Sequence, residues 1–240
     1  MRKNEISVSS KKLGRWTGFF YFLIIFCGLY SGLFVREALI DYSDPSGTLT
    51  NLIEQESTFR MGFLADLVMV ICDVMVAVLF YYLLRFVHGG IALLAMVFRL
   101  IQAAILGANL IQLYKPLLLI QGHGEMADNQ LVQLGHEVLQ QMQLFEYGYL
   151  ISGVFFSVNC LLMGFLLFRS KQFPKVFGWM ITTASFGYLF NCLASFGAPS
   201  LIEISQIIMF FTAVVSEVSL CFYLLIAGGK AGAKLDLSLG

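Results

Sequence analysis

Long uninterrupted runs of apolar residues dominate the pattern along this chain. Six of them reach the roughly 20 residues that a helix needs to cross a bilayer. They are apolar on every face, as in "FFYFLIIFCGLYSGLFV", and do not alternate as the strands of a membrane β-barrel do. The pattern therefore predicts an all-α polytopic membrane helix bundle with six transmembrane helices. The predicted spans lie near residues 16–36, 62–86, 91–114, 144–168, 176–196 and 205–227.

Two of the connections between these spans are long and polar. In the first, "DPSG" predicts a turn, and Leu49, Leu52 and Ile53 then predict a short amphipathic helix on the membrane surface. In the second, apolar residues recur at helical spacing over 131–145 and predict another amphipathic segment, from which the fourth span continues inward. Pro116 is expected to bend or end the third span.

Composition supports the membrane assignment. Hydrophobic residues make up 58% of the chain and charged residues 12%, and the mean hydropathy is +0.80. Soluble domains are about a quarter charged, so this chain has too little polar surface to cover itself in water. The first run follows basic residues, as in a signal peptide, but exceeds the roughly 15-residue apolar limit of such peptides. We therefore interpret it as a retained first helix.

Lys and Arg divide unevenly between the two sides of the membrane. Eleven lie at the two termini and in the second-to-third and fourth-to-fifth connections, three lie on the other side, and Arg99 lies within the third span. Positive residues favour the cytoplasmic side, so both termini are predicted to be cytoplasmic. The predicted organisation is a basic N-terminal segment (1–15), a six-helix transmembrane domain (16–228) and a cytoplasmic tail (229–240).

Pairs of glycines four residues apart occur twice in and before the first span. Gly14 and Gly18 form one pair, and Gly28 and Gly32 form the other. Small residues at this spacing let two membrane helices approach closely. We expect both pairs to pack against neighbouring helices.

The sequence lacks the motifs of several common catalytic and metal-binding sites. The five cysteines lie singly in different spans, without the spacing of a redox pair or a disulfide framework. His88, His123 and His136 do not lie at the depth of a bis-histidine haem, and "HEVLQ" lacks the second histidine of a zinc protease motif. No phosphate loop or nucleophile elbow occurs. The sequence therefore predicts no catalytic residue, no metal, no cofactor and no nucleic-acid partner.

Polar and charged side chains within the spans are the candidate binding or ion-pair cluster. Each ionised group at mid-depth costs at least ~2.5–3.5 kcal/mol, so such groups are expected to meet. Asp66 and Asp73 share one helix face, about 10 Å apart. Asp73 and Glu217 are the expected partners of Arg99, whereas Asp66 is expected to face a polar vestibule open to the outside. The predicted cluster consists of Asp66, Asp73, Arg99, Gln102, Asn109 and Glu217, with a secondary polar lining of Ser152, Asn159, Tyr188 and Asn191.

The charges of this cluster do not balance. The predicted cluster contains three acids against one base, Arg99. Two carboxylates that share one cation in a poorly solvated site do not both ionise readily. We expect one of Asp73 and Glu217 to be the ion-pair partner of Arg99 and the other to hold a proton, unless a cation is bound.

Four segments carry a resemblance to a known family: "FRMGFLADLVMVICDV", "FRLIQAAILGANL", "GYLISGVFFSVNCLLMGFLLFRSKQFPKVFGWM" and "SEVSLCFYLLIAG". From about residue 12 to 228, the chain resembles the bacterial multi-pass membrane proteins of domain of unknown function 4386. The resemblance implies a six-helix protein of the bacterial cytoplasmic (inner) membrane and implies no activity. The matching positions are Arg60, Gly62, Asp66, Asp73, Phe98, Arg99, Gln102, Ala103, Asn109, Arg169, Ser170, Pro174 and Glu217.

The leading functional hypothesis is that the polar interior binds or moves a small polar solute, an ion or a proton. In that role Arg99 holds an anion or sets the ionisation of the carboxyl groups, while Asp73 and Glu217 exchange protons or bind a cation. A structural alternative is an accessory subunit that packs against a larger membrane complex. A third alternative is an intramembrane enzyme that processes lipid, although the sequence offers no paired nucleophile.

The orientation of the chain can be tested with topology reporters. A reporter fused to the C-terminus or inserted at 170–174 is expected to be active only in the cytoplasm, because positive residues gather there. A reporter inserted at 122–128 is expected to be active only outside. Cytoplasmic activity at 122–128 would show that the predicted orientation or number of spans is wrong.

Overall fold

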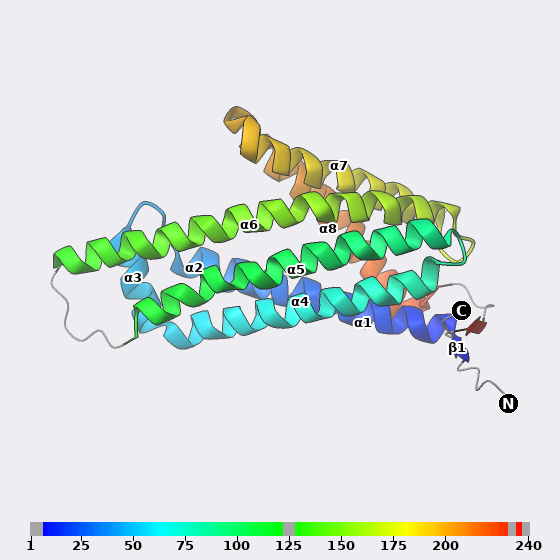
Figure 1. Cartoon of the computed structure of the whole chain (residues 1–240), viewed down its shortest axis with the longest axis horizontal. Helices are drawn as coiled ribbons and strands as arrows, with labels where there is room; N and C mark the ends of the chain where they lie inside the picture. The colour runs from blue at the N-terminus through cyan, green and yellow to red at the C-terminus, as the bar shows by residue number, and fades with distance from the viewer. Residues whose placement is uncertain (1–6, 122–127, 230–233, 237–240) are drawn as a thin grey trace. The chain divides into compact units, whose positions relative to one another are not determined.

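The computed structural model describes residues 7–121, 128–229 and 234–236, and these residues are almost entirely helical (Figure 1). Six helical stretches in this part of the chain are long and apolar enough to cross a membrane, which confirms the predicted number of spans. The loop with His123 and the terminal residues Arg2, Lys3 and Lys230 lie outside the described residues. The six stretches are Ser10–Leu39, Glu56–Leu84, Gly89–Leu119, Gln130–Arg169, Lys175–Gly197 and Pro199–Ala227.

The chain divides into two compact units, each described here by itself. Unit 1 contains Met1–Phe22, Cys72–Ala103 and Ser152–Gly240, and unit 2 contains Leu23–Ile71 and Ala104–Ile151. Four helices contribute one part to each unit. They are α1 (Ser10–Leu29), α4 (Glu56–Leu84), α5 (Gly89–Leu119) and α6 (Asp128–Arg169).

Within unit 2, the first span changes its helical form before it ends. After α1 the chain forms a π-helix, η1 (Tyr30–Arg36), and a last turn, α2 (Glu37–Leu39). The backbone of η1 passes close to α4, where a Cβ on Gly62 would lie 2.8 Å from the Val35 side chain. A residue larger than glycine at position 62 would therefore push η1 away from α4.

The first long connection forms α3 (Pro45–Glu54), which confirms the predicted short amphipathic helix. The "DPSG" segment starts this helix and is not a separate turn: Asp44 caps it by accepting a hydrogen bond from Gly47 N at 2.9 Å, and Pro45 takes the first position. Leu49 and Leu52 are fully buried in the core of unit 2, whereas Ile53 is 42% exposed.

The helices of the third and fourth spans extend beyond the predicted bounds. The α5 helix does not end at Pro116 but continues to Leu119. Proline removes one backbone donor, and so close to the helix end this loss disrupts few hydrogen bonds. The amphipathic residues 131–145 belong to the 42-residue α6, which confirms the prediction that the fourth helix continues from them.

Within unit 1, α7 (Lys175–Gly197) runs along α8 (Ile202–Ala227), to which the 3-10 helix η2 (Pro199–Leu201) connects it (Figure 1). Close approach requires a glycine here too, since a Cβ on Gly187 would lie 2.4 Å from Thr212 Oγ1. At the ends of the chain, the strands β1 (Ser7–Ser9) and β2 (Lys234–Asp236) pair antiparallel.

The first glycine pair packs as expected, and the second only partly. A Cβ on Gly14 would lie 2.0 Å from Gly228 O, and one on Gly18 would lie 2.6 Å from Leu225 N, so both glycines let the backbone of α1 meet that of α8. Gly28 lies against the flexible Met69 side chain, and Gly32 lies only near the side chain of Arg36. The close helix contact therefore depends on the first pair.

Replacement of Gly18 tests this contact. We expect Gly18→Val to lower the thermal stability of the detergent-solubilised protein by about 1–3 kcal/mol or more, because its Cβ would meet backbone atoms that cannot move aside. The control is Leu29→Val, at an exposed position of the same helix, which introduces the same side chain. Equal melting temperatures for the two variants would show that α1 and α8 do not pack through Gly18.

Candidate functional site

An ion pair between α5 and α4 lies in the interior of unit 1. The Arg99 guanidinium donates to Asp73 Oδ1 from Nε at 3.0 Å and from Nη2 at 2.6 Å. Gln102 Nε2 donates to the other carboxylate oxygen at 3.2 Å. All three side chains are buried, so both oxygens of Asp73 have donors in a site closed to solvent. The structure thus places Asp73 against Arg99, as the sequence predicts.

Aromatic rings enclose the same guanidinium. Arg99 Cζ lies 5.2 Å from the centre of the Phe156 ring, on α6, and 5.6 Å from the centre of the Tyr21 ring, on α1. The faces of aromatic rings attract cations, and this attraction strengthens when water is excluded. Arg99 is therefore stabilised by Asp73 and by two rings from other helices.

Glu217, on α8, has a different environment from Asp73. Tyr21 donates a hydrogen bond to its carboxylate at 3.0 Å, and Tyr188 donates a second. No cationic side chain of the described residues forms an ion pair with Glu217, so Asp73 alone of the two expected partners pairs with Arg99. Tyr21 connects the groups, because its ring contacts Arg99 while its hydroxyl contacts Glu217. Glu217 is only partly buried, whereas Asp73 and Arg99 are closed off.

A small cavity lies on another side of Arg99. It has a volume of about 10 Å³ and is lined by Arg99, Asn159 and apolar residues such as Met163. Asn159 Nδ2 donates to Ala95 O at 2.8 Å, while its Oδ1 is buried without a partner among the described residues. A volume of this size accommodates one water molecule where polar groups are at hand. The site could therefore hold a single water between the guanidinium and the amide oxygen.

In unit 2, Asp66 forms a second buried ion pair. Arg36 Nη1 pairs with Asp66 Oδ2, and Ser31 Oγ donates to Asp66 Oδ1 at 2.5 Å. The Arg36 guanidinium also lies over the Phe145 ring, 5.0 Å from its centre. The expected open vestibule was wrong: Asp66 is 1% exposed because Arg36 and Ser31 close the site around it.

The π-helix explains how two residues of one helix reach the same carboxylate. Ser31 and Arg36 are five residues apart, and in an α-helix they would point about 140° apart. A π-helix bonds residue i to residue i+5, which brings such a pair onto one face. Arg36 Nη2 indeed lies 3.4 Å from Ser31 Oγ, as a donor to it. Single π segments occur frequently at functional sites.

The rest of the predicted set is distributed over both units. Asn109, in unit 2, donates from Nδ2 to Phe145 O at 2.7 Å and so satisfies a backbone carbonyl rather than a charge. In unit 1, Ser152 is buried, and Asn191 Oδ1 accepts a hydrogen bond from Ser205 at 3.2 Å. The predicted single cluster is thus two sets, with Asp66 and Asn109 in unit 2 and the other four in unit 1. Among the described residues, no group of three His, Cys, Asp or Glu side chains could hold a metal ion.

Sequence reasoning missed Tyr21, Ser31 and Arg36. The sequence pattern places Arg36 at the outer end of the first span, so Arg99 is the single cation of the predicted cluster. The available signal was depth: Arg36 ends the first span on the side where Asp66 lies near the start of the second. Tyr21 carries no charge, and a tyrosine within an apolar run gives no sign that its hydroxyl reaches a carboxylate.

The whole transmembrane region matches a family model. Residues 16–228 match the model described as "Domain of unknown function (DUF4386)". The chain belongs to this family. It is also 30% identical, over 161 residues, to an uncharacterized protein of Archaeoglobus fulgidus; the match covers 67% of this chain and 80% of that protein. No solved structure matches the chain significantly. Bacterial origin and an inner-membrane location stay predictions.

The Arg99 ion pair can be tested by substitution. We expect Arg99→Leu to destabilise the detergent-solubilised protein by ~3–5 kcal/mol, because it leaves the buried Asp73 carboxylate without its cation. Arg99→Lys keeps the charge but loses the planar fork, so the thermal stability should fall less.

The matched control is Arg60→Leu. Arg60 forms a partly exposed ion pair with Glu56 one turn away on α4, and ion pairs in contact with solvent contribute about 0–1 kcal/mol. If Arg99→Leu melts at the same temperature as Arg60→Leu, the ion pair with Asp73 does not stabilise the fold.

Proposed function

We propose that this DUF4386 protein binds and moves protons, or a small ion or polar solute together with protons, and that Glu217 is the group that exchanges the proton. The observation that carries the proposal is the pairing of the three carboxyl groups in the predicted cluster. Two of them, Asp66 and Asp73, each form an ion pair with an arginine, Arg36 and Arg99 respectively. Glu217 is the third carboxyl group of this cluster and forms no ion pair with a described residue.

A carboxylate without a cation at this depth is costly in lipid. Binding of a proton or of another cation removes that cost, so the net charge of the site favours occupancy by a positively charged species. Asp73 is less suited to this role, because Arg99 and Gln102 occupy both of its oxygens. Glu217 is also the more accessible of the two, being only partly buried.

The two tyrosines suit a group that changes its protonation state. A tyrosine hydroxyl can donate to a carboxylate and can accept from a carboxylic acid. Tyr21 and Tyr188 can therefore hold Glu217 in both states by rotation of their O–H bonds. Tyr21 further supports a coupling of this proton to the Arg99 ion pair, since it contacts both groups.

An accessory-subunit role remains the second candidate function, and one observation favours it. Arg99 and Asp73 are sealed together in the interior of unit 1, and the adjoining cavity of about 10 Å³ is no larger than one water molecule. Such a closed ion pair also suits a structural role, because buried pairs can fix how helices pack. This candidate requires no proton exchange at Glu217, and that requirement separates the two.

Proton movement can be measured in proteoliposomes that enclose a pH-sensitive dye. Under an imposed membrane potential, we expect the parent protein to move protons and Glu217→Gln to reduce the flux to the level of empty liposomes. Difference infrared spectroscopy of the purified protein across pH 5 to 9 should show a protonated carboxyl band that Glu217→Gln lacks.

The matched control is Glu203→Gln, at an exposed position of the same helix, which should change neither readout. If the parent protein shows neither proton flux nor a carboxyl band that depends on Glu217, proton exchange is excluded. The accessory-subunit role is then the better account.

A further inference from the structure

An apolar groove opens on the surface of unit 1, away from the ion pair. It has a volume of about 460 Å³ and is formed by α5, α6 and α7. Its lining is almost entirely apolar or aromatic, and Thr182 is its most polar side chain. The lining residues are Ile91, Leu161, Phe165, Phe168 and Trp179, together with Leu162, Gly164, Gly178 and Thr182. A groove of this size and composition fits a hydrocarbon chain.

Two cations lie at the rim of this groove and contact its lining directly. Arg169 Cζ lies 5.3 Å from the centre of the Phe165 ring, and Lys175 Nζ lies 5.2 Å from the centre of the Phe168 ring. Both cations are exposed, and neither forms an ion pair with a described residue. The rings that form the wall of the groove thus also hold two positive charges at its edge.

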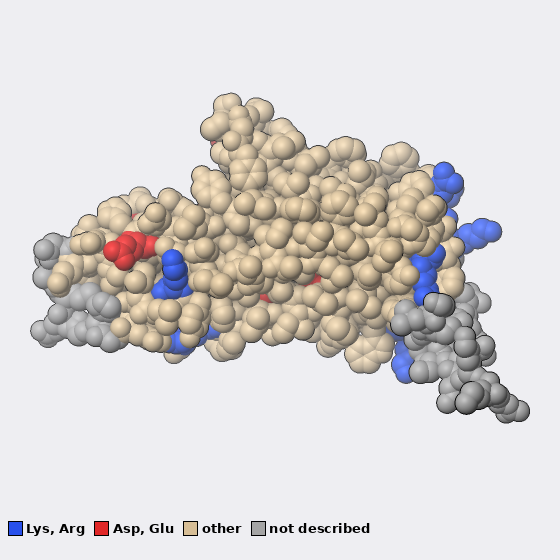
Figure 2. All heavy atoms as spheres, in the orientation of Figure 1, with Lys and Arg blue, Asp and Glu red and all other residues tan. Residues whose placement is uncertain are grey.

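The charged residues of the segment that forms most of the groove are all basic. Between Glu146 and Glu203 the chain has no Asp or Glu, whereas it has Arg169, Lys171 and Lys175 in the turn from α6 to α7. Figure 2 shows Lys and Arg side chains gathered at this end of unit 1, beside a surface of other residues. The local charge therefore favours an anion next to the apolar groove.

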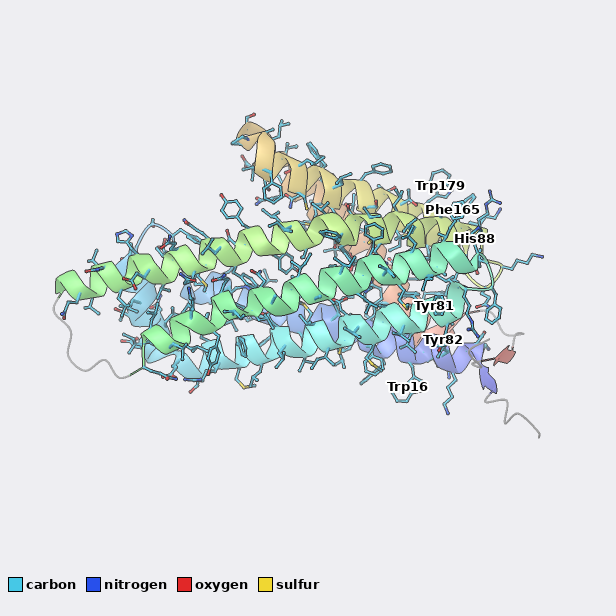
Figure 3. All side chains as sticks on the ribbon, viewed as in Figure 1. Trp16, Tyr81, Tyr82, His88, Phe165 and Trp179 are labelled. Atoms are coloured by element: carbon cyan, nitrogen blue, oxygen red, sulfur yellow. The ribbon has the colours of Figure 1, made fainter. Side chains whose placement is uncertain are left out.

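The aromatic residues mark the depth of the groove in the membrane. Trp179 is 64% exposed and stacks edge-on against Phe168, with ring centres 5.5 Å apart. Figure 3 shows Phe165 and Trp179 next to each other at the end of unit 1 where α6 ends. Tryptophan is enriched at the boundary between hydrocarbon and headgroups. The groove therefore lies where an acyl chain and its headgroup would meet.

From these observations we infer that the groove is a binding site for an anionic phospholipid, with an acyl chain along the apolar lining and the phosphate between Arg169 and Lys175. Basic sites between membrane helices on the cytoplasmic side bind anionic headgroups, and the predicted orientation places this turn on that side. A soluble phosphate compound would leave the apolar groove unfilled. A zwitterionic lipid would fill the groove but would not match the positive rim.

Native mass spectrometry of the purified full-length protein tests the site. Phosphatidylglycerol and phosphatidylcholine with the same acyl chains are titrated separately. The parent protein is expected to retain one phosphatidylglycerol in preference to phosphatidylcholine. Each cation near the headgroup contributes about a fivefold gain in affinity, so Arg169→Gln with Lys175→Gln should weaken phosphatidylglycerol binding about 25-fold. Binding of phosphatidylcholine should change little.

A second variant tests the groove itself. Leu161 is an exposed lining residue, and Leu161→Trp should fill the groove and weaken the retention of both lipids. Leu193→Trp, at an exposed position of α7 outside the groove, is the control for added bulk, and Lys11→Gln with Lys12→Gln is the control for lost charge. Neither control should change lipid retention.

Three outcomes would overturn the inference. One is equal retention of the two lipids by the parent protein. Another is parental affinity in the variant of Arg169 and Lys175, whose side chains are exposed and whose loss leaves the core intact. The third is displacement of the lipid by glycerol phosphate alone, which would show that the headgroup binds without the groove. These readouts do not depend on proton exchange at Glu217.

Discussion

A charged side chain within hydrocarbon needs a partner of opposite charge inside the protein. The ion pair between Arg99 and Asp73 shows that side chains from several helices are needed to provide such a site. Arg99 comes from α5 and Asp73 from α4, while the rings that enclose the guanidinium come from α1 and α6. Tyr21 then extends the contact to Glu217 on α8. Because removal of one partner would leave the other charge unpaired at high cost, these five helices of unit 1 are tied to one geometry.

The helices could be predicted from the sequence because lipid offers no hydrogen bonds to the backbone. Every spanning segment must satisfy its own N–H and C=O groups, so a run of apolar residues implies a helix with little ambiguity. The connections were less predictable. "DPSG" reads as a turn or as a helix start. The segment forms a helix, in which Leu49 and Leu52 are buried in the core of unit 2. Pro116 near the end of α5 shows that a helix breaker has little effect once most hydrogen bonds precede it.

The residue types of the candidate site could also be predicted, since charges in apolar runs are conspicuous, but their partners could not. The ion pair of Asp73 with Arg99 follows from depth and from charge. The pair of Asp66 with Arg36 depends on a π-helix, and the insertion of such a turn has no clear signal in the sequence. The role of Tyr21 depends on which way one hydroxyl points. Which polar side chains contact one another depends on how the helices pack. A hydropathy pattern predicts only that the helices exist.

The two aspartates of α4 show why one helix face can serve two purposes. Asp66 and Asp73 share that face, yet each meets an arginine from a different helix, Arg36 in unit 2 and Arg99 in unit 1. Each arginine also stacks on an aromatic ring of α6, namely Phe145 and Phe156. The same solution to the cost of a buried carboxylate thus occurs twice along one helix. Each aspartate is thus paired with an arginine, and Glu217 is the carboxyl group of the predicted cluster that forms no ion pair with a described residue.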